Sequence, residues 1–456
     1  MKVLFATAEF APKVKVGGLG DASSGLVRAL RDLGIQMEVV LPDYEGEGAG
    51  GIDLDVPGWV GGARAGTLDT PAGQVTLVSS ETLTRPHPYT DQSGEGWPDN
   101  DFRFMAFSAA IAALVEERRP DVLHLNDWHT GATLGFLQDP PPTVLTMHNP
   151  AYQGTTSGLW LSVLERRPEA YEWYGGTNPL TGAIALADRV VTVSPTFATE
   201  LLRPETSFGL DGPLAARGSR FSGILNGIET DIWDPSADPH LPVHYDTENP
   251  SRKRELGRRL SEELSWSASR DPIIGMVTRL TGQKGVDIAL EVAKIVDELG
   301  ARMVLLGSGE APLAESAERV AGLMPDLFRF RHGYDEQLAH LIFGGSDIYL
   351  VPSRFEPCGL TQMQAMRYGA IPVVTNVGGL ADTVVDADAN PTTGTGFVAV
   401  KPTAENFTNA VSRAIRAWRS TKRRGQIRRL GMSQDWSWMR PSRQYLELYR
   451  GLTSAR

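Results

Sequence analysis

LVPSRFEPCGLTQMQAMRYGAIPVVTNVGGLADTV, residues 350–384, is the stretch that decides the fold class of this chain. Its start belongs to an apolar run at 347–353 that predicts a buried strand, and a polar loop follows. Helical apolar spacing over 360–368 stops at Gly369, a residue type that commonly ends helices. A second strand at 371–375 precedes another helix. This order predicts an α/β protein with a doubly wound parallel sheet, whose ligands bind at the carboxyl ends of the strands.

The loops of this unit carry residue types that suit a binding site. Glu356 supplies a carboxylate, and Ser353 and Thr361 supply hydroxyls. Gly378 and Gly379 allow backbone N–H groups to approach a ligand closely. Each residue taken alone could be a solvated loop acid or a turn former. Their occurrence together in one unit favours a site.

Length, charge and cysteine content bound the class of protein. At 456 residues the chain exceeds the about 250–300 residues of a single core, so we expect two or three domains. No apolar run approaches the about 20 residues of a membrane span, and no leader pattern precedes the first strand, which predicts a cytoplasmic protein. A net charge of -11 argues against nucleic-acid and membrane partners. The single cysteine, Cys358, excludes an internal disulfide and a thiolate zinc site.

The start of the chain predicts a strand–helix–strand unit with strands at 2–8 and 36–42 and a helix at about 22–33. The glycine-rich segment KVGGLGD, residues 15–21, precedes the helix, which is a usual place for phosphate binding. Its spacing is not GxGxxG and the loop is long, so a dinucleotide site for NAD is disfavoured. Lys15 adds a cation that suits a phosphate.

Two further strands deliver titratable groups to one edge of the predicted sheet. The strand at 121–125 leads to Asp127, and the strand at 143–147 leads to His148. A lone histidine is more often a structural hydrogen-bonding residue. Here Lys15, Asp127 and His148 all follow strands of one sheet, which favours a functional site.

The chain is expected to change domain near residue 240. Residues 44–100 form an insertion with strand-like patches at 52–56 and 74–80. Residues 233–250 are rich in proline, aspartate and histidine and have no period, which predicts a linker. A last helix is expected to pack back on the first domain. The predicted boundaries are 1–240 for the first domain, 241–436 for the second and 437–456 for the terminal helix.

The second domain places two cations in one loop. Arg279 and Lys284 follow a strand at 272–278. A guanidinium and an ammonium aimed at one point suit a diphosphate, which carries about two to three negative charges. The alternative is a pair of solvated surface cations.

Five motifs, in order along the whole chain, resemble the bacterial glycogen synthases and plant starch synthases. They are KVGGLGD at 15–21, HNPAYQG at 148–154, LNGIETDIWDP at 225–235, TRLTGQKG at 278–285 and PSRFEPCGLTQ at 352–362. The resemblance implies the GT-B fold, with two Rossmann-like doubly wound domains facing across a deep cleft. It also implies a retaining transfer of glucose from ADP-glucose to the non-reducing end of an α-1,4-glucan such as glycogen or a maltooligosaccharide.

Carried over residue by residue, the resemblance implies that Arg279 and Lys284 clamp the diphosphate and that Tyr334 stacks on the adenine. The alternative is that Tyr334 packs under its own loop and closes the edge of the sheet. His148 would lie beneath the transferred glucose, and Glu356 would bind its hydroxyls. The implied catalytic residues are His148, Glu356, Arg279, Lys284 and Asp127. The implied substrate-binding residues are Lys15, Gly17, Gly18, Asp21, Asn149, Asn226, Tyr334, Cys358, Gly359, Leu360, Thr361, Gly378, Gly379 and Leu380.

No cofactor and no metal are expected, because arginine and lysine neutralise the charge that a divalent cation neutralises elsewhere. Retention through a covalent Glu356 adduct and retention by front-face attack both stay open. Two departures from the family pattern are Thr181, where lysine is usual, and a shorter stretch at 155–176. No pattern predicts the oligomeric state.

Four other kinds of protein remain alternatives. A UDP-glucose-dependent transferase or an epimerase could use the same fold. A pyridoxal-phosphate-dependent phosphorylase would need a buried cofactor lysine, which the sequence does not single out. A non-catalytic glucan-binding protein would have no reason to keep Arg279, Lys284 and Glu356 together.

Overall fold

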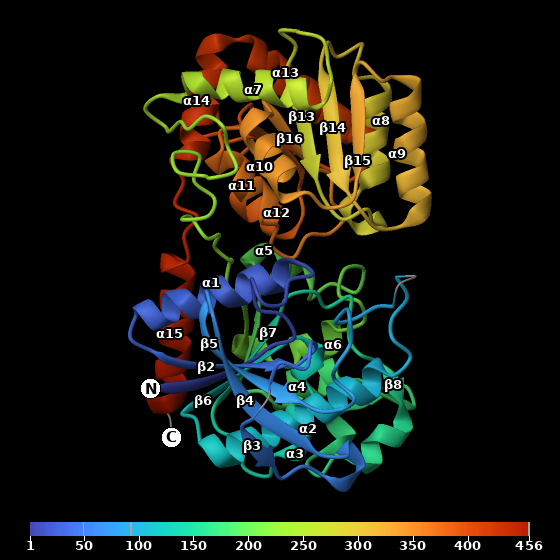
Figure 1. Cartoon of the computed structure of the whole chain (residues 1–456), viewed down its shortest axis with the longest axis vertical. Helices are drawn as coiled ribbons and strands as arrows, with labels where there is room; N and C mark the ends of the chain where they lie inside the picture. Colours follow the sequence, from blue (N-terminus) through green and yellow to red (C-terminus); the bar gives the residue numbers. More distant parts are fainter. Residues whose placement is uncertain (49, 92–93, 455–456) are drawn as a thin grey trace. The chain divides into compact units, whose positions relative to one another are not determined.

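The computed structural model describes residues 1–48, 50–91 and 94–454 (Figure 1). The chain divides into two compact units. Unit 1 comprises Met1–Gly227 together with Trp438–Arg456, and unit 2 comprises Ile228–Ser437. Among the described residues, no helix combines the length and the apolar character needed to cross a membrane.

Unit 1 is built on a nine-stranded sheet in the order β12-β11-β7-β6-β1-β2-β5-β4-β3. From β12 to β5 all neighbours pair in parallel, whereas β4 pairs antiparallel with β5 and β3. Its strands are β1 (Lys2–Ala6), β2 (Gln36–Pro42), β3 (Ile52–Leu54), β4 (Ala63–Thr70), β5 (Gly73–Ser79), β6 (Val122–Asn126), β7 (Thr143–Met147), β11 (Arg189–Thr192) and β12 (Phe221–Gly223). The central strands are buried on both faces, which explains why they are mostly apolar in the sequence.

The helices of unit 1 cover this sheet, and a small second sheet follows β7. The helices are α1 (Gly18–Asp32), α2 (Asn100–Arg118), α3 (Thr133–Phe136), α4 (Pro179–Leu186), α5 (Pro195–Glu200), α6 (Asp211–Ala215) and α15 (Met439–Ser454). The small sheet has the order β8-β10-β9, formed by β8 (Thr156–Ser157), β9 (Glu172–Trp173) and β10 (Gly176–Thr177).

The terminal helix α15 packs on unit 1 beside α1 (Figure 1). A Cβ on Gly25 of α1 would lie 2.0 Å from the indole nitrogen of Trp438, so only glycine allows this close approach. Tyr449 Oη lies 2.6 Å from Nδ1 of His124 on β6, and Tyr445 Oη lies 3.2 Å from Oγ1 of Thr146 on β7. Aromatic packing and buried hydrogen bonds therefore hold the end of the chain against the central strands of the sheet.

Unit 2 has a six-stranded, fully parallel sheet in the order β15-β14-β13-β16-β17-β18. Its strands are β13 (Ile273–Val277), β14 (Arg302–Gly307), β15 (Phe328–His332), β16 (Ile348–Val351), β17 (Ile371–Thr375) and β18 (Phe397–Ala399). Its helices are α7 (Lys253–Glu263), α8 (Val286–Lys294), α9 (Ala311–Leu323), α10 (Glu336–Gly345), α11 (Thr361–Arg367), α12 (Gly378–Thr383), α13 (Ala404–Arg419) and α14 (Thr421–Met432).

Both faces of the unit 2 sheet are covered. Ile274 and Met276 of β13 belong to the core cluster formed with α8, α9 and α13. Gly275, between them, points to the other face, where an added Cβ would lie 2.8 Å from Ile342 of α10. The alternation of side chains along β13 thus explains a glycine inside an otherwise apolar strand.

The expected linker at 233–250 is instead part of unit 2. Asp238 is fully buried there, and its Oδ2 accepts hydrogen bonds from Tyr368 and, at 2.7 Å, from Nδ1 of His340. The Trp233 ring stacks on the imidazole of His340 with centroids 4.3 Å apart. The chain changes unit at Gly227–Ile228, before this segment. Its prolines and aspartates form packed turns, which composition alone does not separate from a flexible connection.

Candidate active site

In unit 1 the carboxyl ends of β1, β6 and β7 lie at one edge of the sheet, because the three strands are parallel neighbours. The loops that follow them carry the predicted residues Lys15, Asp127 and His148. The structure therefore brings these three loops to one place, as the order of the strands predicts.

Asp127 has an unusual backbone and a perturbed carboxyl group. Its φ of 54° lies in a region that side chains other than glycine seldom adopt. Oδ1 accepts hydrogen bonds from the backbone N–H of His148, at 2.7 Å, and of Asn149, at 3.4 Å. Burial raises the pKa of Asp127 to about 7 and outweighs the opposite effect of these hydrogen bonds. The carboxyl group thus holds the start of the HNPAYQG segment in place.

His148 is oriented by Asn126, a residue that the sequence analysis did not select. The Nδ2 of Asn126 donates to the carbonyl of Ala6 at 2.9 Å, so its Oδ1 faces the imidazole and lies 2.9 Å from Nε2 of His148. Nε2 is therefore the protonated nitrogen, and Nδ1 is left as an acceptor. Burial lowers the pKa of His148 to about 3, so the ring is neutral at pH 7. The position of Asn126 as the last residue of a strand was the sequence signal that could have identified it.

Glu9 fixes the glycine-rich loop and was also missed. Its Oε2 accepts from the backbone N–H of Val16 at 2.7 Å and of Gly17 at 2.8 Å, and its Oε1 accepts from the Tyr89 hydroxyl at 2.8 Å. A Cβ on Gly17 would meet no atom within 4 Å, so crowding inside the protein does not require glycine there. The space beside Gly17 is open to a ligand. The sequence signal that could have identified Glu9 is its place as an acidic residue shortly after the carboxyl end of β1.

The remaining predicted residues of unit 1 lie around this edge. Lys15 forms an ion pair with Asp21 on α1, with 2.9 Å between Nζ and Oδ1. Gly18 is the first residue of α1, and Gly17 is its N-cap. Asn226 follows β12 and is buried. The helix begins earlier than the expected residue 22, because the glycine turn itself forms its first turn.

The HNPAYQG segment borders a surface hollow of about 430 Å³ that is lined by Trp128 and residues 151–155. Tyr152 is 58% exposed there. Gly154 has a φ of 70°, and a Cβ on it would lie 2.1 Å from the Trp128 ring. Glycine is thus required for the close contact that shapes this hollow.

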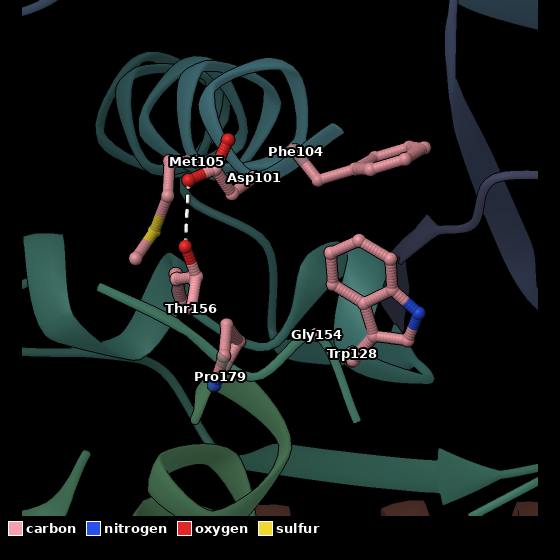
Figure 2. Close-up of a pocket in the computed structure, with 8 residues that line it drawn as sticks. Asp101, Phe104, Met105, Trp128, Gly154, Thr156 and Pro179 are labelled. Carbon is pink, nitrogen blue, oxygen red and sulfur yellow. Dashed lines mark hydrogen bonds between the residues drawn. The ribbon is translucent and has the colours of Figure 1, made fainter. Parts of the chain in front are cut away.

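The small sheet is anchored to α2 through one carboxylate (Figure 2). Oδ2 of Asp101 accepts from Oγ1 of Thr156 at 2.6 Å and from the Trp160 indole at 3.0 Å. The gap that Asp101, Met105 and Thr156 help to line in Figure 2 has no room for a water molecule and is a packing feature. Thr181, which replaces the lysine usual in the family, is buried in the first turn of α4, and its hydroxyl donates to the Asn178 carbonyl at 2.9 Å.

In unit 2 the loops after β13 and β16 meet through an ion pair. Nζ of Lys284 lies 2.7 Å from Oε2 of Glu356, which also accepts from the Ser353 hydroxyl at 2.9 Å. Glu356 is only 5% exposed, whereas the Lys284 side chain is 21% exposed. Arg279 is exposed, and its guanidinium has no ion pair with any residue that the structure describes. One cation of the loop is therefore paired and the other remains available to an anion.

Two glycines let these loops approach each other. A Cβ on Gly285, whose φ is 65°, would lie 2.1 Å from the carbonyl oxygen of Pro352. A Cβ on Gly379 would lie 2.0 Å from the carbonyl oxygen of Cys358. The loops after β13, β16 and β17 are thus joined by close backbone contacts, which only glycine permits at these two positions.

The amides of Gly378, Gly379 and Leu380 were expected to be available to a sugar. Two of them are already used. The N–H of Gly379 donates to the carbonyl of Glu356 at 3.0 Å, and the N–H of Leu380 donates to the carbonyl of Val377 at 3.0 Å. The packing of Gly379 on residues 356–358 supplies the acceptor for its amide, whereas the amide of Leu380 donates to the N-cap residue of its own helix α12.

The other predicted residues of unit 2 lie on the same loops. Cys358 is buried, Gly359 has a φ of 71°, Leu360 is the N-cap of α11 and Thr361 is its first residue. Tyr334 follows β15 and is 70% exposed, so it does not pack under its loop. It lies at the same edge as Arg279, but β14 separates their strands.

A buried lysine in unit 2 bears on the phosphorylase alternative. Lys253 is 2% exposed, and burial lowers its pKa well below the usual value. Its Nζ donates to the carbonyls of Gly344 at 2.6 Å and Phe343 at 3.2 Å, which ties the start of α7 to the end of α10. These bonds give Lys253 a structural role that accounts for its burial.

Comparisons with known proteins agree over the whole chain. Residues 2–216 match the family model described as the starch synthase catalytic domain, and residues 262–430 match the glycosyl transferases group 1. Glycogen synthases from Halorhodospira halophila and Alkalilimnicola ehrlichii are each 39% identical to this chain. The matches cover 100% of both chains for the first, and 99% of this chain and 98% of the relative for the second.

Solved structures lead to the same result. The catalytic domain of starch synthase IV from Arabidopsis thaliana, bound to ADP and acarbose, is 33% identical, with a TM-score of 0.90 and 99% of each chain covered. A sucrose-phosphate synthase from Thermosynechococcus elongatus, at 19% identity and a TM-score of 0.66, shares the fold. The resemblance seen in the five motifs is confirmed. The chain has the GT-B fold and belongs to the glycogen synthase and starch synthase family of glycosyltransferases.

Proposed function

We propose that the chain transfers glucose from ADP-glucose to the non-reducing end of an α-1,4-glucan, with retention of configuration and release of ADP. The observation that carries the proposal lies in the loop after β13. Lys284 is held 2.7 Å from Glu356, while Arg279 is exposed and has no ion pair among the described residues. Two cations and a carboxylate at the carboxyl edge of a parallel sheet suit a sugar diphosphate.

The two cations act on the leaving group. Negative charge grows on the diphosphate as its bond to glucose breaks, and fixed cations stabilise that charge without reorganisation. Arg279 supplies two parallel N–H donors to phosphate oxygens. The ammonium of Lys284 has three donors and can bind Glu356 and a phosphate oxygen together. Glu356, oriented by Ser353 and Lys284, binds hydroxyls of the glucose.

The residues of unit 1 act on the sugar and the phosphates mainly through hydrogen bonds. Nε2 of His148 is used by Asn126, which leaves Nδ1 to accept from a hydroxyl of the transferred glucose. Lys15 and the open space at Gly17 serve the donor phosphates. The hollow at residues 151–155, with its exposed Tyr152, receives the glucan.

The donor is assigned as ADP-glucose on two grounds. The related starch synthase IV structure holds ADP and acarbose, a nucleotide and an oligosaccharide analogue. The exposed Tyr334 offers a ring for stacking on a purine, which is worth about 1–3 kcal/mol per base in nucleic-acid-binding proteins. We also propose a cytoplasmic enzyme without nucleic-acid or membrane partners, and the net charge of -11 supports the absence of those partners. Cosedimentation with anionic vesicles or with DNA at physiological salt would contradict the absence of membrane or nucleic-acid partners.

The test is incubation of the full chain with glycogen and, in parallel, ADP-glucose, UDP-glucose or NADH. We expect release of ADP equal to the glucose incorporated, α-linked product by NMR, and a higher kcat/KM for ADP-glucose than for UDP-glucose. Glycogen binding without transfer from either sugar nucleotide would support a non-catalytic glucan-binding protein and reject the proposal. An absorbance band near 330 nm with phosphate-dependent release of glucose phosphate would support a phosphorylase instead.

A further inference from the structure

Three metal-ligating side chains converge in unit 2 outside the residues assigned to the donor and the glucan. One ring nitrogen each of His240 and His340 and one carboxylate oxygen of Glu336 all lie within 4.8 Å of one another. Glu336 and His340 are one helical turn apart on α10 and therefore share a face of that helix. His240 comes from the segment at 233–250 that packs within unit 2.

These three groups have unused ligand atoms. The carboxylate of Glu336 and the imidazole of His240 form no side-chain hydrogen bond or ion pair with any residue in the described parts of the chain. His340 is 2% exposed, and its Nδ1 is bonded to Asp238, which leaves Nε2 for a metal. A buried imidazole with one nitrogen engaged and the other unused is the state of a histidine that ligates a metal.

Asp238 orients both histidines. Its Oδ2 accepts from Nδ1 of His340 at 2.7 Å, and its Oδ1 accepts from the backbone N–H of His240 at 2.9 Å. This carboxylate fixes the ring of His340, as in the carboxylate–histidine–metal arrangement of zinc proteins.

We propose that His240, Glu336 and His340 form a zinc site with an open fourth position for water. Two imidazoles and one carboxylate are a known three-residue set for Zn²⁺, whereas Mg²⁺ and Ca²⁺ prefer oxygen ligands only. Ligands at about 2.0–2.2 Å in a tetrahedral site lie about 3.4 Å apart, so atoms that now lie within 4.8 Å of one another close by about 1.4 Å at most on binding. The exposed Glu336 and half-buried His240 are able to make this adjustment.

A surface hollow of about 480 Å³ adjoins the cluster, lined by residues 239–242 and by Glu262, Gln337 and Leu341 among others. It gives the ion and its water a route from solvent. Zinc there joins the segment at 233–250 to α10, so it binds the folded unit and raises its stability by mass action.

The test uses the full chain, stripped with a chelator and dialysed, and titrated with ZnCl₂ by calorimetry, with metal content measured after gel filtration. The variants are His240→Ala and Glu336→Gln. The matched control is His332→Ala, which removes an exposed histidine of β15 in the same unit. We expect about one zinc per chain in the wild type and the control, at least about tenfold weaker binding in both cluster variants, and a zinc-dependent rise in Tm that the cluster variants lose.

Three results would overturn the proposal. They are the absence of stoichiometric zinc in the wild type, equal zinc affinity in wild type and His240→Ala, and a rise in Tm with Mg²⁺ equal to that with Zn²⁺. Glu336 is exposed, so Glu336→Gln keeps the test valid if His240→Ala lowers the stability of the metal-free chain. Metal content and Tm do not depend on transferase activity, so the outcome is independent of the proposed function.

Discussion

The carboxyl edges of the two sheets present different chemistry. In unit 1 the imidazole of His148 is neutral at pH 7, Asp127 has a pKa of about 7, and both are fixed by hydrogen bonds to the surrounding loops. In unit 2 Arg279 is exposed, and Lys284 forms an ion pair with Glu356.

The difference suits the assignment proposed above, in which the two edges bind different parts of a sugar nucleotide. A sugar offers hydroxyls, which neutral donors and acceptors bind best when they are preorganised. A diphosphate offers negative charge, which cations bind even from partly exposed positions. We therefore expect changes at Arg279 and Lys284 to affect mainly the leaving group, and changes at His148 and Asp127 to affect mainly the sugar and the pH profile.

The largest effect is expected for Arg279→Ala. Removal of one group that stabilises charge in the transition state costs about 2.7–4 kcal/mol, or about 10²–10³ in kcat. The exposed Arg279 has no ion pair in the described protein, so Tm should not change. Steady-state kinetics with ADP-glucose and glycogen, together with calorimetry, measure both. A kcat within about threefold of the wild type would remove Arg279 from the diphosphate site.

Lys284→Ala serves as the contrasting variant. It should lower kcat by a similar factor, but it also leaves the buried Glu356 without its cation. An unsatisfied buried partner costs about 1–3 kcal/mol, so this variant, unlike Arg279→Ala, should also lose stability in denaturant unfolding. Equal stability of the two variants would show that the ion pair contributes nothing to the fold.

A smaller effect, about tenfold in kcat/KM for ADP-glucose, is expected for Glu9→Gln. The neutral amide weakens the two hydrogen bonds that Glu9 accepts from Val16 and Gly17 and so loosens the loop. Tyr89→Phe is the matched control, because it removes only the hydroxyl that donates to the other carboxylate oxygen. If Tyr89→Phe impaired the enzyme as much as Glu9→Gln, the loop amides would not be the important contact.

Tyr334→Ala should raise the KM for ADP-glucose about tenfold, or about 1.4 kcal/mol. With 70% of its surface exposed, the residue adds little to the core, so Tm should stay nearly constant. Tyr334→Phe keeps the ring and should bind the donor as the wild type does. A fall in Tm without a selective change in KM would indicate a packing role instead.

A further prediction concerns the dependence of stability on pH. The pKa of Asp127 is raised from its usual acidic range to about 7, so the folded chain holds this proton more tightly than the unfolded chain. The carboxyl group therefore costs no stability below about pH 4, costs progressively more up to about pH 7, and costs a constant amount above. Asp127→Asn removes this titration. The free energy of unfolding is measured for both proteins at pH 5 and pH 8. The variant should be more stable relative to the wild type at pH 8 than at pH 5. The same stability difference at both pH values would contradict the shifted pKa.

The fold could be read largely from apolar runs and helical spacing. The unit β16–α11–β17–α12 was predicted from residues 347–384, because fully buried parallel strands are continuous apolar runs. β4 was missed, since its sequence ARAGTLDT consists largely of small and polar residues and it is ordered by antiparallel pairing with β5. Its pattern carries little of the alternation that marks a strand.

The site was predictable as a set of loops but not as a set of contacts. Strand ends pointed to Asp127, His148, Arg279 and Glu356, because ligands bind at such ends. The Lys284–Glu356 pair joins residues 72 positions apart, and nothing local indicates it. The acceptor of the Gly379 amide likewise depends on how two loops pack.

The most direct test of the contrast between the two sheet edges is the affinity for ADP, measured by calorimetry without glucan. The variants to compare are Arg279→Ala in unit 2 and His148→Ala in unit 1. The account predicts that Arg279→Ala weakens ADP binding by at least about tenfold, or about 1.4 kcal/mol. His148→Ala should change the affinity by less than about threefold, although it lowers kcat. Equal losses of ADP affinity in the two variants, or a larger loss in His148→Ala, would contradict the assignment of the diphosphate to the cations of unit 2.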